Sequence, residues 1–350
     1  MTIDITGRDQ WQAWQDGVLP PVERVRDGVW SIPVPIPDNP MRYVLVYALE
    51  CRDGVALIDA GWDDDRSWRA LVDGLDTAGF AMPDVRAVLV THFHADHLGL
   101  ADRVREASGA WVALHALDAR ERPPEGQAPR IAAEMRRHLV GHGVPATTAR
   151  TIVRAMPIER FARQPRPDVL LEDDETVRLP GLDLTVVWTP GHSPGHSCFY
   201  DSDRQLLFSG DHILPRITPQ IAVMRQNEGD PLTTFLASLD RLERYSVDEV
   251  LPAHEYRFRG LDGRLTDIAK HHTRRLAELF TAVRAAPGST AWQLCAALSW
   301  SRPWAAFDLL NKRFALAETL AHLTLLVTRG EVRSGVVDGT ARWYSSTVDG

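Results

Sequence analysis

Residues 85–99 read VRAVLVTHFHADHLG. The first six of these residues form a short, continuous apolar run of the kind that a buried strand needs. Imidazole and carboxylate groups follow at once, and these are the ligands that borderline divalent metals such as zinc prefer. They are His92, His94, Asp96 and His97. The stretch therefore predicts a buried strand that ends in a metal-binding loop with room for two adjacent ions.

Segments with strand and helix patterns alternate around this stretch. β-branched and aromatic runs at 29–36, 42–50 and 55–62 are separated by the turn signals PDNP and CRDG. Apolar residues at helical spacing follow at 67–79. Further segments of both kinds are expected, with strands at 110–115, 175–179, 182–189, 197–203, 205–210 and 248–255 and helices at 100–108 and 231–245. This alternation predicts an α/β domain built in layers.

Two regions depart from this alternation. Residues 117–168 are rich in Arg, Ala and Pro and predict a helical insertion, which in such a position often forms a lid over a site. After residue 260 the strand patterns stop. Helices are predicted there at 262–286, 291–300, 305–314 and 315–330, followed by a hairpin at 331–346. We therefore predict an N-terminal extension at 1–27, a main domain at 28–259 and a winged-helix-like module at 260–350.

The composition excludes several classes of protein. The formal net charge of −8 is not that of a polycation, so attraction of the whole chain to nucleic acid or an anionic membrane is not expected. No run approaches 18 uninterrupted apolar residues, and the polar start lacks the pattern of a secretory leader. The three cysteines form no CxxC pair, so no disulfide framework is expected. These features together favour a cytoplasmic protein without a membrane span.

Ligand-type residues also follow other apolar runs. LTVVWT leads into a PGHSPGH segment, LLFSG leads into an Asp-His pair, and EVLPA leads into a His-Glu pair. An α/β sheet builds a site in this way, by placing functional side chains at the ends of its strands. The residues in question are His192, His196, Asp211, His212 and His254.

In order along the chain, five motifs resemble those of the metallo-β-lactamase superfamily, and most closely its glyoxalase-II-like hydrolase branch. The resemblance covers about residues 28–258 and implies a four-layer αββα sandwich with metals at one edge. The tail is similar to the winged-helix domain that some of these proteins carry, at 271–276, 291–294 and 318–323. The five motifs are VLIDAG (56–61), THFHADHLG (91–99), TPGHSPGH (189–196), SGDH (209–212) and PAHE (252–255).

The resemblance implies two divalent metal ions, with zinc expected and manganese or iron as alternatives. His92, His94 and His192 would bind the first ion, and Asp96, His97 and His254 would bind the second. Asp211 would bridge the two ions, and Asp59 would orient ligands from behind. A hydroxide formed between the ions would attack a carbonyl or phosphoryl centre, with Asp96 holding it in place. The neighbouring His196 and His212 are candidates for a direct role in proton transfer, or else are structural.

The substrate class stays open at this point. Hydrolysis of an acyl thioester, on CoA or on a carrier protein, is favoured because a thiolate leaves easily and the metals supply the rest. The alternatives are cleavage of single-stranded RNA and lactone hydrolysis. Leu214 stands where lactonases often place a tyrosine, which disfavours the last of these. A β-lactamase, a glutathione thioesterase and an inactive binding scaffold are less favoured.

Candidate substrate residues lie in three places. Met41 and Arg42 match a loop that often borders the pocket in this family, and Leu214 is expected to line it. Arg136 and Arg137, in the predicted insertion, are candidates to bind the phosphates of CoA, although a solvated helix face is the favoured explanation for them. The tail helix at 315–326 is mostly apolar, so no DNA binding is expected, and a homodimer is possible.

Overall fold

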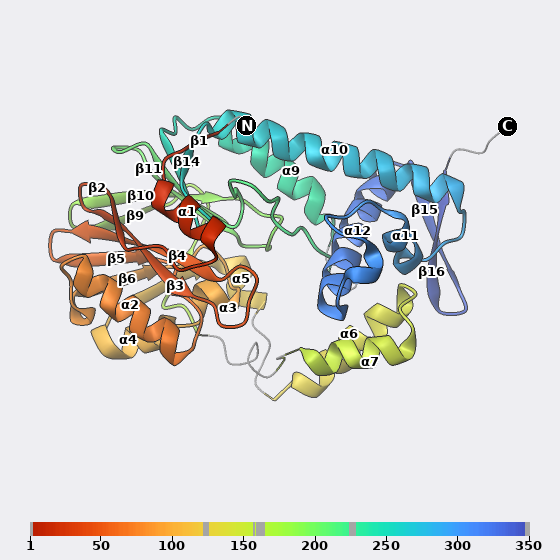
Figure 1. The fold of residues 1–350 in the computed structure, drawn as a ribbon, viewed down its shortest axis with the longest axis horizontal. Helices are drawn as coiled ribbons and strands as arrows, with labels where there is room; N and C mark the ends of the chain where they lie inside the picture. Colours follow the sequence, from red (N-terminus) through yellow and green to blue (C-terminus); the bar gives the residue numbers. More distant parts are fainter. Residues whose placement is uncertain (1–2, 122–125, 157, 159–164, 224–228, 347–350) are drawn as a thin grey trace. The chain divides into compact units, whose positions relative to one another are not determined.

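The structure is a computed structural model that describes residues 3–121, 126–156, 158, 165–223 and 229–346. The chain divides into two compact units, which we describe separately and which Figure 1 draws. The first comprises 1–122, 163–219 and 238–266, and the second comprises 123–162, 220–237 and 267–350. Parts of the predicted insertion, at 122–125, 157 and 159–164, lie outside the described residues.

The first unit is built on two sheets of seven strands each. One sheet has the strand order β2-β3-β4-β5-β6-β7-β8, with antiparallel pairs up to β5 and parallel pairs from β5 to β8. Its strands are β2 (Glu23–Arg26), β3 (Val29–Pro35), β4 (Tyr43–Cys51), β5 (Gly54–Ile58), β6 (Val85–Leu89), β7 (Trp111–His115) and β8 (Val169–Leu171).

The other sheet has the order β1-β14-β13-β12-β11-β10-β9 and is antiparallel except for the pair β12 and β13. Its strands are β1 (Asp4–Ile5), β9 (Thr176–Leu179), β10 (Leu182–Trp188), β11 (Ser197–Asp201), β12 (Leu206–Gly210), β13 (Glu249–Pro252) and β14 (Phe258–Arg259). The strands expected from the sequence are therefore confirmed.

An apolar core joins the two sheets. Side chains from both sheets, among them Leu45, Tyr47, Phe199, Phe208 and Leu251, are buried in one cluster. The rings of Tyr47 and Phe208 meet edge to face with centroids 5.3 Å apart. Burying one large apolar side chain contributes roughly 1.5–3 kcal/mol, so this layer is a major source of stability.

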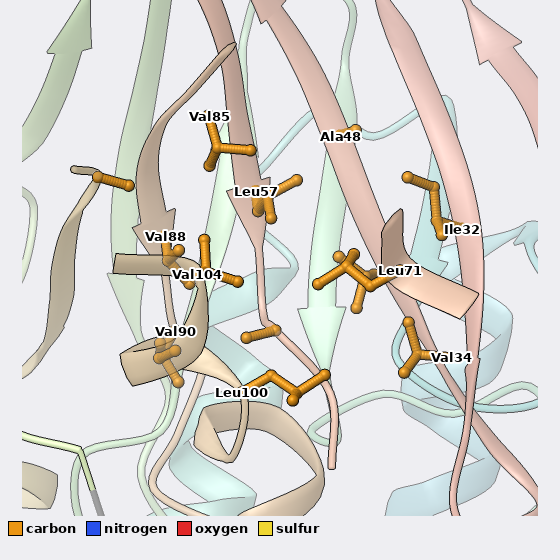
Figure 2. Close-up of a cluster of buried hydrophobic side chains, with 14 of the residues drawn as sticks. Ile32, Val34, Ala48, Leu57, Leu71, Val85, Val88, Val90, Leu100 and Val104 are labelled. Carbon is orange, nitrogen blue, oxygen red and sulfur yellow. The ribbon is translucent and has the colours of Figure 1, made fainter. Parts of the chain in front are cut away.

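Helices cover the outer face of the first sheet. α2 (Asp65–Thr77) begins after Asp64, whose side chain accepts a hydrogen bond from the amide of Arg66. Leu71 of α2 and Val104 of α4 (Ala101–Ser108) pack onto the strands with Leu57 and Val88, as Figure 2 shows. The other short helices of this unit are α1 (Arg8–Asp16), the 3-10 turn η1 (Met82–Asp84), α3 (Ala95–Leu98) and α5 (Ala116–Glu121).

The N-terminal segment belongs to the sheets of the first unit. β1 pairs with β14, and β2 pairs with β3. Gln10 of α1 is fully buried and donates a hydrogen bond to Ser31. Residues 4–26 are therefore part of this unit's architecture, and strands as short as β1 carry too few residues to show a periodic pattern.

The second unit is mostly helical. Its tail helix corrects the sequence analysis, which expected separate helices at 305–314 and 315–330. The structure has one helix, α12 (Leu309–Thr328), because Asp308 caps it through the amide of Asn311 and the helix contains no Gly or Pro to interrupt it. A short 3-10 turn, η2 (Trp304–Ala306), takes the place of the first expected helix.

The remaining elements of the tail and insertion agree with expectation. The predicted hairpin is confirmed as β15 (Val332–Val337) and β16 (Thr340–Ser345), which pair in antiparallel register. None of the described helices is both long and apolar enough to span a bilayer. The other helices of the insertion and tail are α6 (Ala128–Gly141), α7 (Ala146–Ala155), α10 (Leu261–Ala285) and α11 (Ala291–Ala297). The helix α9 (Pro231–Leu242) was also expected, and the residues of α9 and α10 fall partly in each unit.

Candidate metal centre

Strand ends of the first unit carry the candidate ligands. β5, β6 and β7 run parallel, so their carboxyl ends share one edge of the sheet, and β12 and β13 also end together. After β6, residues 90–94 lead into the single-turn helix α3, in which the amides of His97 and Leu98 donate to the carbonyl of His94. This turn places His92 and His94 in one group of candidate ligands and Asp96 and His97 in a second, neighbouring group.

Three imidazole nitrogens converge in the first group of ligands. His94 Nδ1 lies 2.9 Å from His92 Nε2 and 3.0 Å from His192 Nε2, and the two Nε2 atoms are 3.2 Å apart. Three ring nitrogens cannot all be hydrogen-bonded to one another, because each bond needs one donor and one acceptor. Metal–nitrogen bonds of about 2.0–2.1 Å in a tetrahedron put the nitrogens about 3.3 Å apart, so the triangle fits a metal ion.

The second group consists of Asp96, His97 and His254. Asp96 Oδ2 lies 3.5 Å from His254 Nε2 and 3.8 Å from His97 Nε2. His254 donates from Nδ1 to the carbonyl of Tyr43 at 2.8 Å, which leaves its Nε2 as the ligand atom. His97 Nε2 is buried without a hydrogen-bond partner among the described residues. This donor set also fits a divalent metal.

Asp211 lies between the two groups. Its Oδ2 is 3.4 Å from His192 Nε2, and its Oδ1 is 3.2 Å from His254 Nε2. The same two oxygens are also near His92 and His97, at 3.9 and 3.6 Å. One carboxylate oxygen therefore faces each group, which is the geometry that a bridging ligand needs.

Asp59 orients the second group from behind. It follows β5 with a positive φ of 62° and is buried. Its Oδ2 lies 2.7 Å from His97 Nδ1, and its Oδ1 accepts a hydrogen bond from the amide of Thr91 at 2.8 Å. The carboxylate thus fixes the tautomer of His97 and aims Nε2 at the other ligands.

The two groups have opposite electrostatics. In the first, burial and the neighbouring imidazoles lower the pKa of His94 to about 3, so its ring is neutral and ready to bind a metal. In the second, burial opposes a charge on His254, but the carboxylates of Asp211 and Asp96 raise its pKa to about 10. A site rich in carboxylates that favours a positive charge also favours a divalent cation.

His196 and His212 are buried next to the ligands. His196 Nε2 accepts a hydrogen bond from the amide of Asp211 at 3.2 Å, and its Nδ1 lies 2.8 Å from the hydroxyl of Thr189. Burial lowers the pKa of His212 to about 3. These contacts give His196 a clear means of positioning Asp211, while a direct role of either ring in catalysis stays a prediction.

The candidate substrate residues differ in exposure. Met41 is half-buried against the core, and Leu214 is buried with 2% of its surface exposed. Arg42 is exposed and stacks over Trp14, with its guanidinium carbon 4.6 Å from the ring centroid. Arg136 and Arg137 are exposed on α6 in the second unit, away from the ligands in sequence. Met41, Arg42 and Leu214 belong to the first unit, so the predicted role of Arg136 and Arg137 in substrate binding stays a prediction.

Sequence reasoning missed one buried carboxylate beside the ligands. Asp118 of α5 accepts hydrogen bonds from the amide of Phe93, the hydroxyl of Ser193 and the amide of Gly195. The only signal in the sequence is an aspartate three residues after a strand, which is too common to stand out. Its neighbours come from two distant loops, so only the fold reveals it.

Two sheets with two histidine and aspartate groups at their edge define a class of metal-dependent hydrolases. Residues 40–254 match the metallo-beta-lactamase superfamily, and residues 276–346 match the metallo-beta-lactamase-like C-terminal domain. The first match covers more than half of the chain, which therefore belongs to the metallo-beta-lactamase superfamily. The αββα class and the assignment as a hydrolase of this fold are thereby confirmed, and the winged-helix character of the tail stays a prediction.

One solved structure is similar over nearly the whole chain. It is a metallo-beta-lactamase family protein from Thermus thermophilus, which is 31% identical, with 92% of this chain and 100% of that chain covered and a TM-score of 0.77. This likeness includes the second unit as well as the sheets.

Curated relatives match over shorter regions. An acyl-coenzyme A thioesterase, MBLAC2 from Gallus gallus, is 28% identical over 57% of this chain and 67% of its own length. An atrochrysone carboxyl ACP thioesterase from Cryptosporiopsis is 27% identical over 32% of this chain and 33% of its own. A hydroxyacylglutathione hydrolase from Cereibacter sphaeroides is 28% identical over 48% of each chain. The chain thus spans between a third and two thirds of these relatives.

Proposed function

We propose that this protein is a hydrolase of acyl thioesters, such as acyl-CoA or carrier-bound acyl groups, that depends on two divalent metal ions, with zinc the expected metal. The convergence of three imidazole nitrogens within 3.2 Å of one another carries the metal-dependent part of the proposal. The names of the curated relatives support the thioester part, since two of the three are named as thioesterases.

The two groups of ligands would hold the ions. His92, His94 and His192 would bind one, Asp96, His97 and His254 the other, and Asp211 would contact both. When bound, such ions activate a water molecule at neutral pH and polarise a carbonyl oxygen. Zinc suits the first group best, because imidazole nitrogens in a small, buried triangle match its tetrahedral preference.

The exposure of the ligand side chains indicates from which side solvent and substrate reach the centre. His92 and His97 are fully buried, whereas the side chain of Asp96 keeps 19% of its surface exposed. Solvent and substrate therefore reach the centre past Asp96 rather than past these rings. A carboxylate at that position accepts hydrogen bonds only, so Asp96 is suited to orient a water molecule with one proton directed toward it.

A covalent cysteine mechanism is not supported. All three cysteines are buried, and burial raises the pKa of the Cys198 thiol to about 12. A thiol of this kind is inert at neutral pH, since the thiolate is the nucleophile. Direct attack by water is sufficient for a thioester, because the departing thiolate needs no proton.

Single-stranded RNA and lactones remain the alternative substrates. An RNA-cleaving enzyme must also clamp a charged backbone, and the formal net charge of −8 does not favour this. For lactones, Leu214 takes the place of a tyrosine, and its apolar, buried side chain offers no hydroxyl at that point. Neither alternative is supported by an observation as specific as the thioesterase relatives.

Metal removal and restoration test the proposal. Protein treated with chelator should lose acyl-CoA hydrolysis and regain it when zinc, manganese or iron is added. His192→Ala should stay inactive after the same treatment, because it lacks one ligand of the first group. His142→Gln, a histidine of the second unit outside the ligand groups, serves as the control and should behave like the unsubstituted chain. Hydrolysis that survives complete metal removal would refute the proposal.

A further inference from the structure

Asp118 is a fully buried carboxylate at the edge of the sheet that carries the ligands. It lies in α5, three residues after the end of β7, and β7 is the neighbour of β6, which leads into the histidine loop. Burial raises the pKa of Asp118 to about 7, although three hydrogen bonds to the carboxyl oppose the rise. A buried acid costs free energy, so its presence here calls for a reason.

The hydrogen bonds of Asp118 reach two ligand loops. Its Oδ2 accepts from the amide of Phe93 at 3.0 Å and from the hydroxyl of Ser193 at 2.7 Å. Phe93 stands between His92 and His94, and Ser193 follows His192 directly. One carboxylate oxygen therefore connects the two segments that carry all three histidines of the first group.

The second carboxylate oxygen fixes the same loop at another point. Asp118 Oδ1 accepts a hydrogen bond from the amide of Gly195 at 2.5 Å. A Cβ at position 195 would lie 2.5 Å from the backbone nitrogen of Asp118, which is closer than real contacts allow. The glycine in the PGHSPGH segment thus permits the close approach that this bond needs.

Asp118 and Asp59 flank the histidine loop from opposite sides. Asp59 follows β5 and holds the amide of Thr91, whereas Asp118 follows β7 and holds the amide of Phe93. These two amides stand on either side of His92 in the chain. Asp59 contacts the ring of His97 in the second group, whereas Asp118 accepts its hydrogen bonds from the segments around His92, His94 and His192.

We propose that Asp118 is a positioning residue that ties the loop of His92 and His94 to the loop of His192 and so keeps their three ring nitrogens convergent. The inference rests on the proposed metal-dependent function. It assigns one buried carboxylate to each metal group, Asp118 to the first and Asp59 to the second. Loss of either should therefore weaken the binding of one ion and spare the other.

The test uses chains that keep only one group. His97→Ala leaves the three-histidine group, and His192→Ala leaves the Asp96 and His254 side. Asp118→Asn is introduced into each, and the affinity for zinc is measured by competition with a chromophoric chelator. Asn keeps the shape of Asp but places an NH2 against one of the donors. Asp203→Asn, an exposed carboxylate of the same unit, is the matched control.

In the His97→Ala chain, Asp118→Asn should weaken zinc binding roughly 10- to 100-fold. In the His192→Ala chain it should change the affinity less than about threefold. Asp59→Asn should give the reverse pattern, because it acts through His97. A merely structural loss would lower the affinity in both chains alike, and equal effects would overturn the inference.

Ser193→Ala covers the case in which Asp118→Asn does not fold. It removes one of the three hydrogen bonds to Asp118 and should weaken the same group by several-fold, again only in the His97→Ala chain. No effect of a folded Ser193→Ala or Asp118→Asn variant would contradict the inference. If the unsubstituted chain binds no divalent ion at all, the proposed function fails instead, so the two failures are distinguishable.

Discussion

Asp59 Oδ2 lies 2.7 Å from His97 Nδ1, and both groups are buried, Asp59 directly after β5 and His97 in α3, which follows the neighbouring parallel strand β6. The contact makes Nδ1 the nitrogen that donates to Asp59, so Nε2, which faces Asp96 and Asp211, is the atom that would bind a metal. In metal sites, a carboxylate that accepts a hydrogen bond from a histidine ligand commonly fixes the tautomer of that histidine and raises its basicity. We therefore expect the centre to depend on Asp59, although this residue would not touch a metal itself.

Asp59→Asn should weaken binding of the second ion without disturbing the backbone. Asn tolerates the positive φ of this position, so the turn is retained while the negative charge behind His97 is lost. We expect zinc affinity at the second group to fall roughly 10- to 100-fold, with turnover falling in parallel. Metal content after stepwise dialysis measures this. Retention of two ions with unchanged affinity would argue against the role of Asp59.

The number of ions should follow the two ligand groups. His97→Ala should release about one ion per chain, because His92, His94 and His192 stay in place for the other. His192→Ala should release the opposite ion. Elemental analysis of protein purified without chelator gives the stoichiometry. Loss of both ions from either variant would mean that the groups bind as one cooperative site.

The second unit should become less stable in mild acid because of a buried histidine pair. His272 Nδ1 on α10 lies 3.1 Å from His322 Nε2 on α12, and the second ring nitrogen of His322 bonds to the carbonyl of Glu318. Burial lowers the pKa of His272 to about 2 and of His322 to about 4, with Arg275 and His271 adding in the same direction.

The sign follows from the unfolded chain, where both imidazoles titrate near pH 6.5. Below that pH the unfolded state binds more protons, so stability present above pH 6.5 is lost as the pH falls. Each ring contributes roughly 1–2 kcal/mol to this loss between pH 6.5 and 5. His272→Gln should therefore reduce the fall in Tm between pH 7.5 and pH 5, whereas Lys270→Gln should not. An unchanged fall would exclude the pair as its cause.

Arg136 and Arg137 can be tested as phosphate-binding residues. If they recognise CoA, the double change Arg136→Gln and Arg137→Gln should raise KM for acyl-CoA roughly tenfold and leave kcat alone. KM for the same acyl group on N-acetylcysteamine, which lacks phosphates, should stay unchanged. Arg130→Gln is the control on the same helix, since Arg130 is paired with Glu134 at 2.8 Å. Equal changes in KM for both substrates would argue against phosphate binding by these two arginines.

Much of the metal centre could be predicted because its ligands follow strands. The apolar run at 85–90 fixes where β6 ends, and the ligand pattern of His92, His94, Asp96 and His97 starts directly after it. The prediction that Asp211 lies between the two ligand groups rests on the family resemblance. The spacing of the residues alone does not indicate which carboxylate would bridge the two ions. The local sequence pattern and the family motifs together were thus sufficient to predict the candidate metal ligands.

Other features depend on contacts that no local pattern carries. Asp118 is set apart only by its hydrogen bonds to Phe93 and Ser193, which are 25 and 75 residues away. The prediction of two helices at 305–314 and 315–330 is wrong, because residues 309–328 contain no Gly or Pro and continue as one helix across that boundary. Leu214 follows Asp211 closely in the sequence and was therefore expected to line the pocket, but its side chain is buried. Burial of this kind depends on tertiary packing, which the local sequence does not reveal.

A side-by-side assay of one zinc-loaded preparation on long-chain acyl-CoA, a homoserine lactone and single-stranded RNA distinguishes the candidate substrate classes. Turnover of acyl-CoA should scale with metal occupancy and fall at least about a hundredfold in Asp96→Asn, because that change removes a proposed ligand that also orients the water. Turnover of the other two substrates should be weak or absent. Efficient RNA or lactone cleavage together with negligible thioester hydrolysis would contradict the proposed function.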